Sequence, residues 1–279
     1  MHSMIPSFDF SRWVLLVKQH WIENKKRYLL SVGAAAGILS MWFFFMMMVN
    51  DLDPMEDSIQ RGTYFFLLFS GGCFYASQFF RELGSRSKAI NYLLLPASSL
   101  EKLMVSLLYV VVLYFIVYTA IFFLVDMIMV NFANAFHSAY NTPNANGVIH
   151  KASVVNVFSW FGIENAIPFF LAAFFAVQAA FLLGSVYFER YSFVKTIISL
   201  FCLLIVLWLI VGFLLNSLLP HGSYMRDIGT YRISSEKGEG DYLIELPLVI
   251  RKVIIALFQW GFPFFFWVVT YFRLKEKEV

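Results

Sequence analysis

Residues 196–219 read TIISLFCLLIVLWLIVGFLLNSLL and contain no charged side chain. A helix needs about 20 predominantly apolar residues to cross the hydrocarbon core of a bilayer, and this run is long enough. Five more runs of similar character lie elsewhere along the chain, at 28–49, 63–80, 103–130, 163–188 and 253–272. This rhythm predicts an all-α polytopic membrane protein with six transmembrane helices.

The composition agrees with a membrane location. Hydrophobic residues make up 60% of the chain, against about 45–50% in soluble proteins. Charged residues make up only 14%, and the net charge of +3 is too small to indicate nucleic-acid binding. We therefore expect one integral domain over 28–279 in contact with the lipid bilayer, preceded by a separate segment over 1–27.

Positive charge predicts the orientation of the spans, because cytoplasmic loops carry an excess of Lys and Arg. With the N-terminus placed inside, the inner breaks at 1–27, 81–102, 189–195 and 273–279 hold 14 of the 21 Lys and Arg residues. The outer breaks hold the other 7. We expect six spans with both termini in the cytoplasm, and a bacterial inner membrane as the location.

The segment before the first span has a helical pattern of its own. Its large apolar residues recur at the spacing of one helix face: Phe10, Trp13, Val14, Val17 and Trp21. An amphipathic helix of this kind is suited to the membrane interface. The alternative interpretation is a helix that packs on another subunit.

No motif in the chain indicates catalysis. The P-loop pattern, H-E-x-x-H and G-x-S-x-G are all missing from the sequence. The five histidines show no recognised metal-ligand spacing, although His137 and His150 share one outer loop. We expect neither enzymatic activity nor a cofactor or metal in this chain.

Few polar side chains fall within the spans. Asp126 lies toward the outer end of the third span, close enough to the interface for hydration to be expected. Gln178 and Gln259 lie deeper, where they either line a path or bond a neighbouring helix. Ionisable residues at the membrane midplane are typical of ion-coupled carriers, so their scarcity argues against that class. The many Phe residues either form a wall for an apolar substrate or simply fill space.

The inner break at 81–102 carries the clearest local pattern. A charged turn leads into a short apolar run that predicts a helix over 87–95, which Pro96 ends. Ser98 and Glu101 then have the spacing of a capping box, which starts the next helix. The alternative is a surface loop anchored to lipid headgroups.

These features together resemble the permease subunit of ABC-2 type (type V) ABC transporters, in a short form like those of Bacteroidetes. The likeness rests on the predicted architecture and on three short matches, LPASSLEK at 95–102, LGSVYF at 183–188 and FVKT at 193–196. The resemblance implies a separate ABC ATPase subunit, two permease copies as a homodimer or heterodimer, and export of a substrate.

The resemblance also implies site residues. The segment that couples to the ATPase would contain Arg81, Glu82, Arg86, Lys88, Asn91 and Tyr92. Short re-entrant helices before the last span would approach an outer gate, with Pro247 at the approach and Gly261 and Pro263 permitting a kink. The long charged stretch 226–245 departs from the family pattern and suggests a small external element.

Two other classes stay open at this point. The chain could be a membrane scaffold or assembly subunit that transports nothing. It could also be a lipid-modifying enzyme, although clustered His or carboxylate residues at one membrane face, expected for such an enzyme, are not evident in the sequence.

Overall fold

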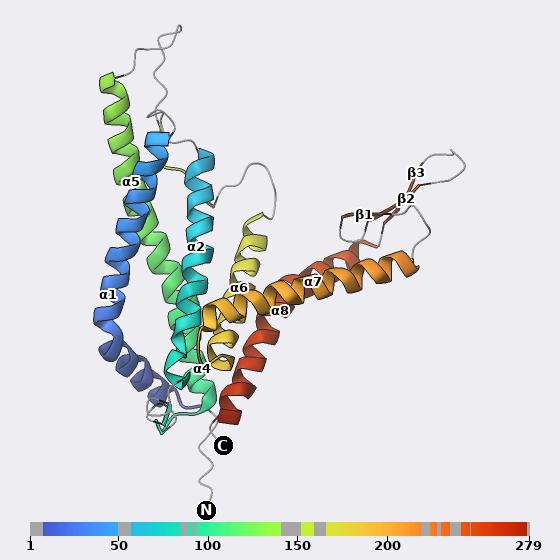
Figure 1. The fold of residues 1–279 in the computed structure, drawn as a ribbon, viewed down its shortest axis with the longest axis horizontal. Helices are drawn as coiled ribbons and strands as arrows, with labels where there is room; N and C mark the ends of the chain where they lie inside the picture. The colour runs from blue at the N-terminus through green and yellow to red at the C-terminus, as the bar shows by residue number, and fades with distance from the viewer. Residues whose placement is uncertain are drawn as a thin grey trace, which may run out of the picture.

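The computed structural model describes residues 8–49, 57–84, 89–90, 92, 94–140, 152–158, 166–218, 224–227, 230–234, 241–245 and 247–277. Long helices dominate it, with one small sheet (Figure 1). The longer elements are α1 (Phe10–Val49), α2 (Asp57–Phe79), α5 (Tyr114–Tyr140), α6 (Ala166–Tyr187), α7 (Ser192–Leu218) and α8 (Leu248–Lys277). The shorter ones are η1 (Arg81–Gly84), α4 (Ser99–Leu107), η2 (Leu108–Leu113), β1 (Tyr224–Asp227), β2 (Thr230–Ser234) and β3 (Asp241–Glu245).

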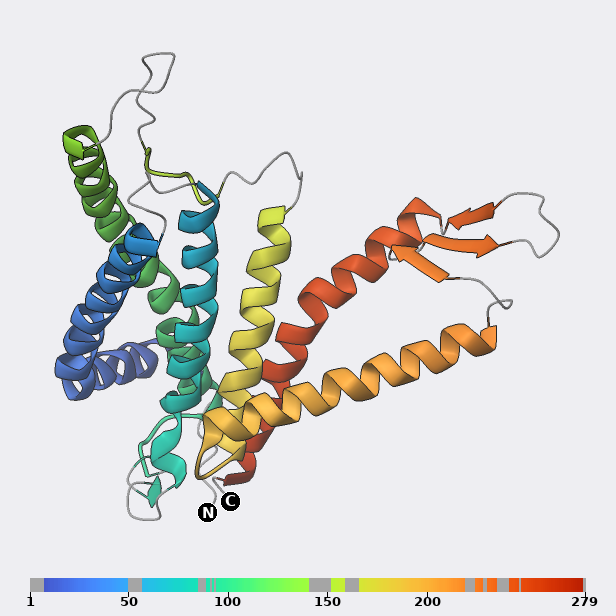
Figure 2. The ribbon, with the colours of Figure 1, turned by 45° about the horizontal axis from the view of Figure 1, so that its top comes forward.

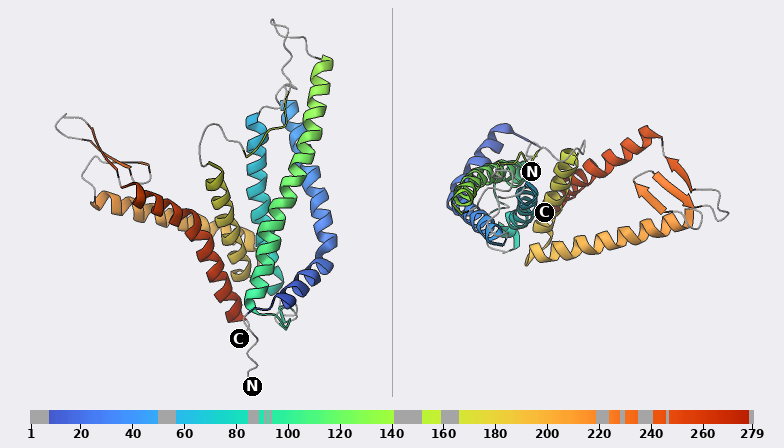
Figure 3. Two further views of the ribbon diagram at one scale, coloured as in Figure 1. Left: turned by 180° about the vertical axis from the view of Figure 1, so that it is seen from behind. Right: turned by 90° about the horizontal axis from the view of Figure 1, so that it is seen from above.

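Among the residues that the structure describes, five helical segments are long and apolar enough to cross a membrane. They are Phe10–Val49, Ser99–Ala135, Ile167–Tyr187, Ser192–Leu214 and Leu248–Lys277. The expected span at 63–80 is also a helix, α2, but it is not among these five. Its sequence includes Ser, Thr, Tyr, Gln and paired Gly residues, and it packs into the bundle with one face while Phe66 and Phe74 on the other face are exposed (Figure 3).

A bundle of α1, α2, α5 and α6 forms the body of the molecule, and aromatic side chains fill its core. Phe122 of α5 is completely buried and packs on Phe43 of α1 and Tyr64 of α2, with ring centroids 5.8 and 4.9 Å apart. Phe174 of α6 meets Phe69 of α2 edge to face. Contacts of this kind bury large apolar areas and favour one relative placement of the helices.

One long helix runs through α4, η2 and α5, and η2, which joins the short α4 to the long α5, is a π-helix. The turn over Leu108–Leu113 widens without a break in helical structure on either side. Such turns are rare and often lie at functional sites. Here the wider turn changes how the side chains before it, on α4, align with those after it, on α5.

Helix α7 and the first part of α8 leave the bundle as an arm (Figures 1 and 2). The outer ends of the two helices are joined by the chain that contains an antiparallel sheet in the order β1-β2-β3, which pairs Tyr231 with Ile244. This sheet falls on the charged stretch 226–245 and is an addition to the all-α class expected from the sequence. We call the bundle end where α1 begins and α8 ends the basal end.

The N-terminal segment and the first span form one helix rather than two. α1 is 40 residues long, about 60 Å at the usual rise. Figure 2 shows its first part running at an angle to the rest, across the basal end. Trp13, Val14 and Val17, from the apolar face identified in the sequence, are half-buried against the body of the same chain.

Candidate functional site

The basal end brings together parts of the chain that are distant in sequence. The start of α1, η1, the start of α4, the turn between α6 and α7, and the end of α8 meet there (Figure 1). At Gly84 the approach is close, since an added Cβ would lie 2.3 Å from the carbonyl oxygen of Glu189. The inner breaks at 81–102 and 189–195 are therefore in contact with each other.

The capping box predicted at Ser98 and Glu101 is confirmed. The backbone N–H of Glu101 donates to Ser98 Oγ at 3.3 Å, and the backbone N–H of Ser98 donates to Glu101 Oε2 at 2.8 Å. These bonds satisfy two backbone donors at the start of α4. The cap fixes where the helix begins.

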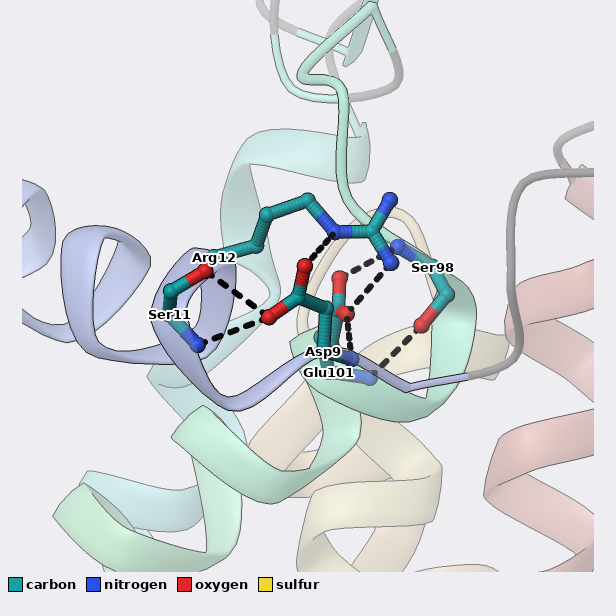
Figure 4. Close-up of polar contacts among 5 residues, drawn as sticks. All are labelled: Asp9, Ser11, Arg12, Ser98 and Glu101. Carbon is teal, nitrogen blue, oxygen red and sulfur yellow. Dashed lines mark hydrogen bonds and ion pairs between the residues drawn. The ribbon is translucent and has the colours of Figure 1, made fainter.

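Glu101 also connects α4 to the start of α1, which the sequence did not indicate. Its second oxygen, Oε1, accepts from the backbone N–H of Asp9 at 2.7 Å and from Arg12 Nη2 at 2.9 Å (Figure 4). The Glu101 side chain is completely buried, whereas that of Arg12 is 26% exposed. One carboxylate thus caps one helix and holds another, and charge-assisted bonds of this kind are the stronger ones.

The residues around Arg12 complete this Glu101 junction. The backbone N–H and the hydroxyl of Ser11 donate to Asp9 Oδ1 at 2.9 and 2.8 Å, and these bonds lower the pKa of the exposed Asp9 carboxyl. The Arg12 guanidinium lies 3.9 Å from Asp9 Oδ2. Arg12 therefore sits between two carboxylates, one exposed and one buried.

The coupling segment expected at 81–95 is described in part. Ala89, Ile90 and Tyr92 are helical, and the N–H of Leu94 donates to the carbonyl of Ile90 at 2.9 Å, in agreement with the predicted short helix. Tyr92 packs on Phe80 at the end of α2 and lies 5.5 Å below the buried Lys102 ammonium. The segment is attached to both α2 and α4.

The other predicted residues of this segment differ in placement. Arg81 is exposed and donates to Gln78 Oε1 at 3.3 Å, and Glu82 is exposed beside it. Arg86, Lys88 and Asn91 lie outside the described residues. The ends of the predicted coupling segment are therefore anchored to the bundle, and its described charges face outward.

A series of tyrosines, which the sequence patterns did not predict, runs from the basal end into the bundle. His20 Nε2 lies 2.5 Å from the Tyr28 hydroxyl, and the Tyr109 hydroxyl donates to the carbonyl of Val17 at 3.0 Å. Neighbouring ring centroids are 5.6 to 6.1 Å apart through the pairs Tyr28–Tyr109, Tyr28–Tyr75, Tyr75–Tyr114, Tyr114–Tyr118 and Tyr64–Tyr118. The spacing of Tyr114 and Tyr118 could have indicated that they share one helix face. The position of Tyr109 relative to them could not be predicted in this way, because Tyr109 lies in the π-helix.

The polar residues within the spans behave differently from one another. Gln178 is buried, and neither polar atom of its side chain has a hydrogen-bond partner among the described residues. It faces the glycine pair of α2, since a Cβ at Gly72 would lie 1.9 Å from Gln178 Nε2. Gln259 is half-buried on α8. The structure does not bring the two glutamines together in one described contact.

The expectation that Asp126 is hydrated is wrong. Its side chain is completely buried, and within the described part of the chain neither carboxyl oxygen has a hydrogen-bond partner. Phe122, one helical turn earlier, packs against α1, so Asp126 lies on a helix that is covered by the bundle at this level. A buried, unpaired carboxyl group is costly.

The predicted outer gate lies on the arm. Strand β3 and then α8, which begins at Leu248, occupy the place where short re-entrant helices were expected. Pro247 is exposed, and its carbonyl accepts from the N–H of Arg251 at 3.1 Å. Pro263 is buried inside α8, which changes direction along its length (Figure 1). Gly261 has open space around it, so no close approach requires a glycine there.

Comparison with protein-family models, with curated proteins and with solved structures found no match to this chain. Among the described residues, no group of three or more His, Cys, Asp or Glu could hold a metal ion. The features of the molecule that indicate a function are therefore the apolar helices and the geometry of the basal end.

Proposed function

We propose that this chain is the membrane-spanning permease subunit of an ABC-2 type ABC transporter. A separate ATPase subunit would bind the basal end at 81–95, and nucleotide hydrolysis there would drive export. The observation that carries this proposal is the Glu101 junction. Because Glu101 bonds Asp9, which precedes α1, and Arg12 of α1 as well as the cap of α4, a force on the adjoining segment reaches two long helices.

The proposal includes six spans, with α2 as the sixth, and both termini in the cytoplasm. An even number of crossings is supported by the positions of the chain ends, because the start of α1 and the end of α8 lie at the same end of the bundle (Figure 1). An even number of crossings leaves both chain ends on one side, whereas five would leave them on opposite sides. Compartment-sensitive reporters fused to each terminus should both report the cytoplasm, and opposite sides would contradict the six-span topology.

An apolar or lipid-like substrate fits the composition of the bundle. A narrow crevice between α2, α5 and α6, too small to hold a substrate in this structure, is lined by apolar and aromatic residues, including Phe65, Phe115 and Phe174. Phe65 and Phe170 stack there with centroids 4.6 Å apart.

The direct test is co-purification with a P-loop ATPase encoded beside this chain, followed by measurement of nucleotide hydrolysis. We expect a stable complex, and we expect R86E with K88E to reduce binding and hydrolysis strongly. The matched control is R232E with K237E, which makes the same charge change on the segment between α7 and α8 and should leave the complex intact. A chain that binds no ATPase would refute the proposal.

A non-transporting scaffold is the second candidate, and the exposed apolar arm favours it. The most apolar 18 residues of Ser192–Leu214 include no buried residue, so this helix is free to contact other membrane proteins. A scaffold would bind protein neighbours without stimulating nucleotide hydrolysis, and the same co-purification separates the two functions.

A further inference from the structure

The first part of α1 has an inward face that is bound to the rest of the molecule. The Tyr109 hydroxyl donates to the carbonyl of Val17 at 3.0 Å, and His20 packs on the Tyr109 ring at 4.6 Å. Arg12 and the backbone of Asp9 bond Glu101. These contacts fix the rotation of the helix, so its opposite face points away from the body.

The outward face carries two apolar residues and three lysines. Leu15 and Ile22 are 64% and 65% exposed, and their spacing of seven residues places them on one side of the helix. Lys18 lies three residues after Leu15, and Lys25 and Lys26 lie three and four residues after Ile22. Residues at such spacings are neighbours on a helix surface, so the lysines flank the apolar pair.

The lysines are not neutralised within the described structure. Lys18, Lys25 and Lys26 are exposed and form no ion pair with another described residue. Glu23 is the one acidic residue of 10–27, and it accepts a bond from Gln19 at 2.9 Å. This surface therefore holds a net positive charge beside exposed apolar side chains.

The location of the surface indicates what covers it. The same helix continues beyond residue 27 into a candidate span, and its first part runs at an angle to that span (Figure 2). An amphipathic helix at a membrane boundary buries its apolar side chains among acyl chains, while its lysines extend to the headgroups. Basic residues close to a span attract anionic lipids over zwitterionic ones.

We propose that the outward face of α1, formed by Leu15, Lys18, Ile22, Lys25 and Lys26, binds the phosphate headgroups of anionic phospholipids. The inward face of the same segment bonds Glu101, so bound lipid stabilises the contact between α1 and α4. This inference depends on the membrane location of the chain and not on the identity of any partner subunit.

The test titrates the purified full chain in detergent with phosphatidylglycerol or phosphatidylcholine and follows the melting temperature. We expect half-maximal stabilisation at a roughly tenfold lower concentration of phosphatidylglycerol. The variant K18Q/K25Q/K26Q should lose this preference, whereas K18R/K25R/K26R should keep it. The control R190Q/K252Q/K275Q removes the same charge from exposed positions elsewhere and should also keep it.

Three results would overturn the proposal. The first is a K18Q/K25Q/K26Q variant that keeps the preference for phosphatidylglycerol. The second is an equal loss in the R190Q/K252Q/K275Q control, because net charge alone would then explain the effect. The third is an equal stabilisation by glycerol phosphate at the same concentration, which would assign the site to a free phosphate rather than to a lipid.

Discussion

Helices α6 and α7 are consecutive, similar in length and both apolar, yet they have opposite environments. In the most apolar stretch of α6, 56% of the residues are buried inside the molecule, whereas the corresponding stretch of α7 has no buried residue. α2 is a third case, because it packs into the bundle with one face and is too polar to count among the five candidate spans. Among these five spans, α7 is both the least buried and the most apolar.

The physical reason is that lipid and protein interiors are equally apolar, so burial between helices needs shape rather than hydrophobicity. α2 provides that shape with Gly71 and Gly72, which admit Tyr114 and Gln178. α7 has Gly212 in open space and exposes large side chains along its length. We therefore expect the same substitution to have different effects in the bundle and in the arm.

The largest expected difference concerns an aromatic residue. F122A removes a completely buried ring and should destabilise the bundle by about 3–5 kcal/mol. F213A removes a ring that is 74% exposed on α7 and should change stability by less than about 0.5 kcal/mol. Unfolding of both variants in mixed micelles measures the contrast. An equally large loss for F213A would show that a partner covers the arm.

The next prediction compares the buried carboxylate of Glu101 with the exposed carboxylate of Glu276. E101A leaves Arg12 and the N–H groups of Asp9 and Ser98 without their acceptor, at a cost of about 3 kcal/mol. E276A breaks the exposed i,i+3 pair with Arg273 near the end of α8 and should cost less than about 1 kcal/mol. The unfolding free energies of the two variants provide the measurement. Equal costs would show that burial of Glu101 contributes nothing.

Glycine substitutions should produce a difference in sign. In G184A the new methyl would lie 1.9 Å from Thr196 Oγ1 and 2.9 Å from its Cβ, so the contact between α6 and α7 must open, at about 1–3 kcal/mol. In G212A the methyl meets nothing within 4 Å, and better helix propensity should stabilise by up to about 1 kcal/mol. Thermal unfolding of the two variants, compared with the unsubstituted chain, gives both signs. Destabilisation by G212A would indicate a close neighbour at the arm.

Local patterns in the sequence predicted much of the fold. The apolar runs at 163–188 and 196–219 fall on helices within a few residues of their ends, because span length is set by the bilayer. The run at 103–130 lies within a helix that continues to Tyr140. The capping box at Ser98 and Glu101 was visible because its two partners are three residues apart. The predicted span at 63–80 is a helix, but its hydropathy alone does not identify it as a membrane crossing.

The contacts that build the basal end could not be predicted in this way. Glu101 meets Asp9 across 92 positions of sequence and Arg12 across 89, and no periodicity relates them. The tyrosine series depends on a π-helix at Leu108–Leu113, which apolar residues alone do not signal. The sheet near the outer ends of the arm helices was expected only as an external element, since strand pairing depends on register rather than on composition.

The smallest predicted effect tests whether every buried group in the bundle contributes to stability. Asp126 is completely buried without a hydrogen-bond partner in the described structure, so its carboxyl group opposes folding. D126N keeps the shape of the side chain and removes its ability to ionise, and we expect a gain of up to about 1 kcal/mol in the unfolding free energy. D57N, at an exposed residue of α2 paired with Arg61, is the control and should change stability little. A clear loss of stability in D126N would mean that the carboxylate binds a cation or a partner, because a group retained against its own cost indicates a functional role.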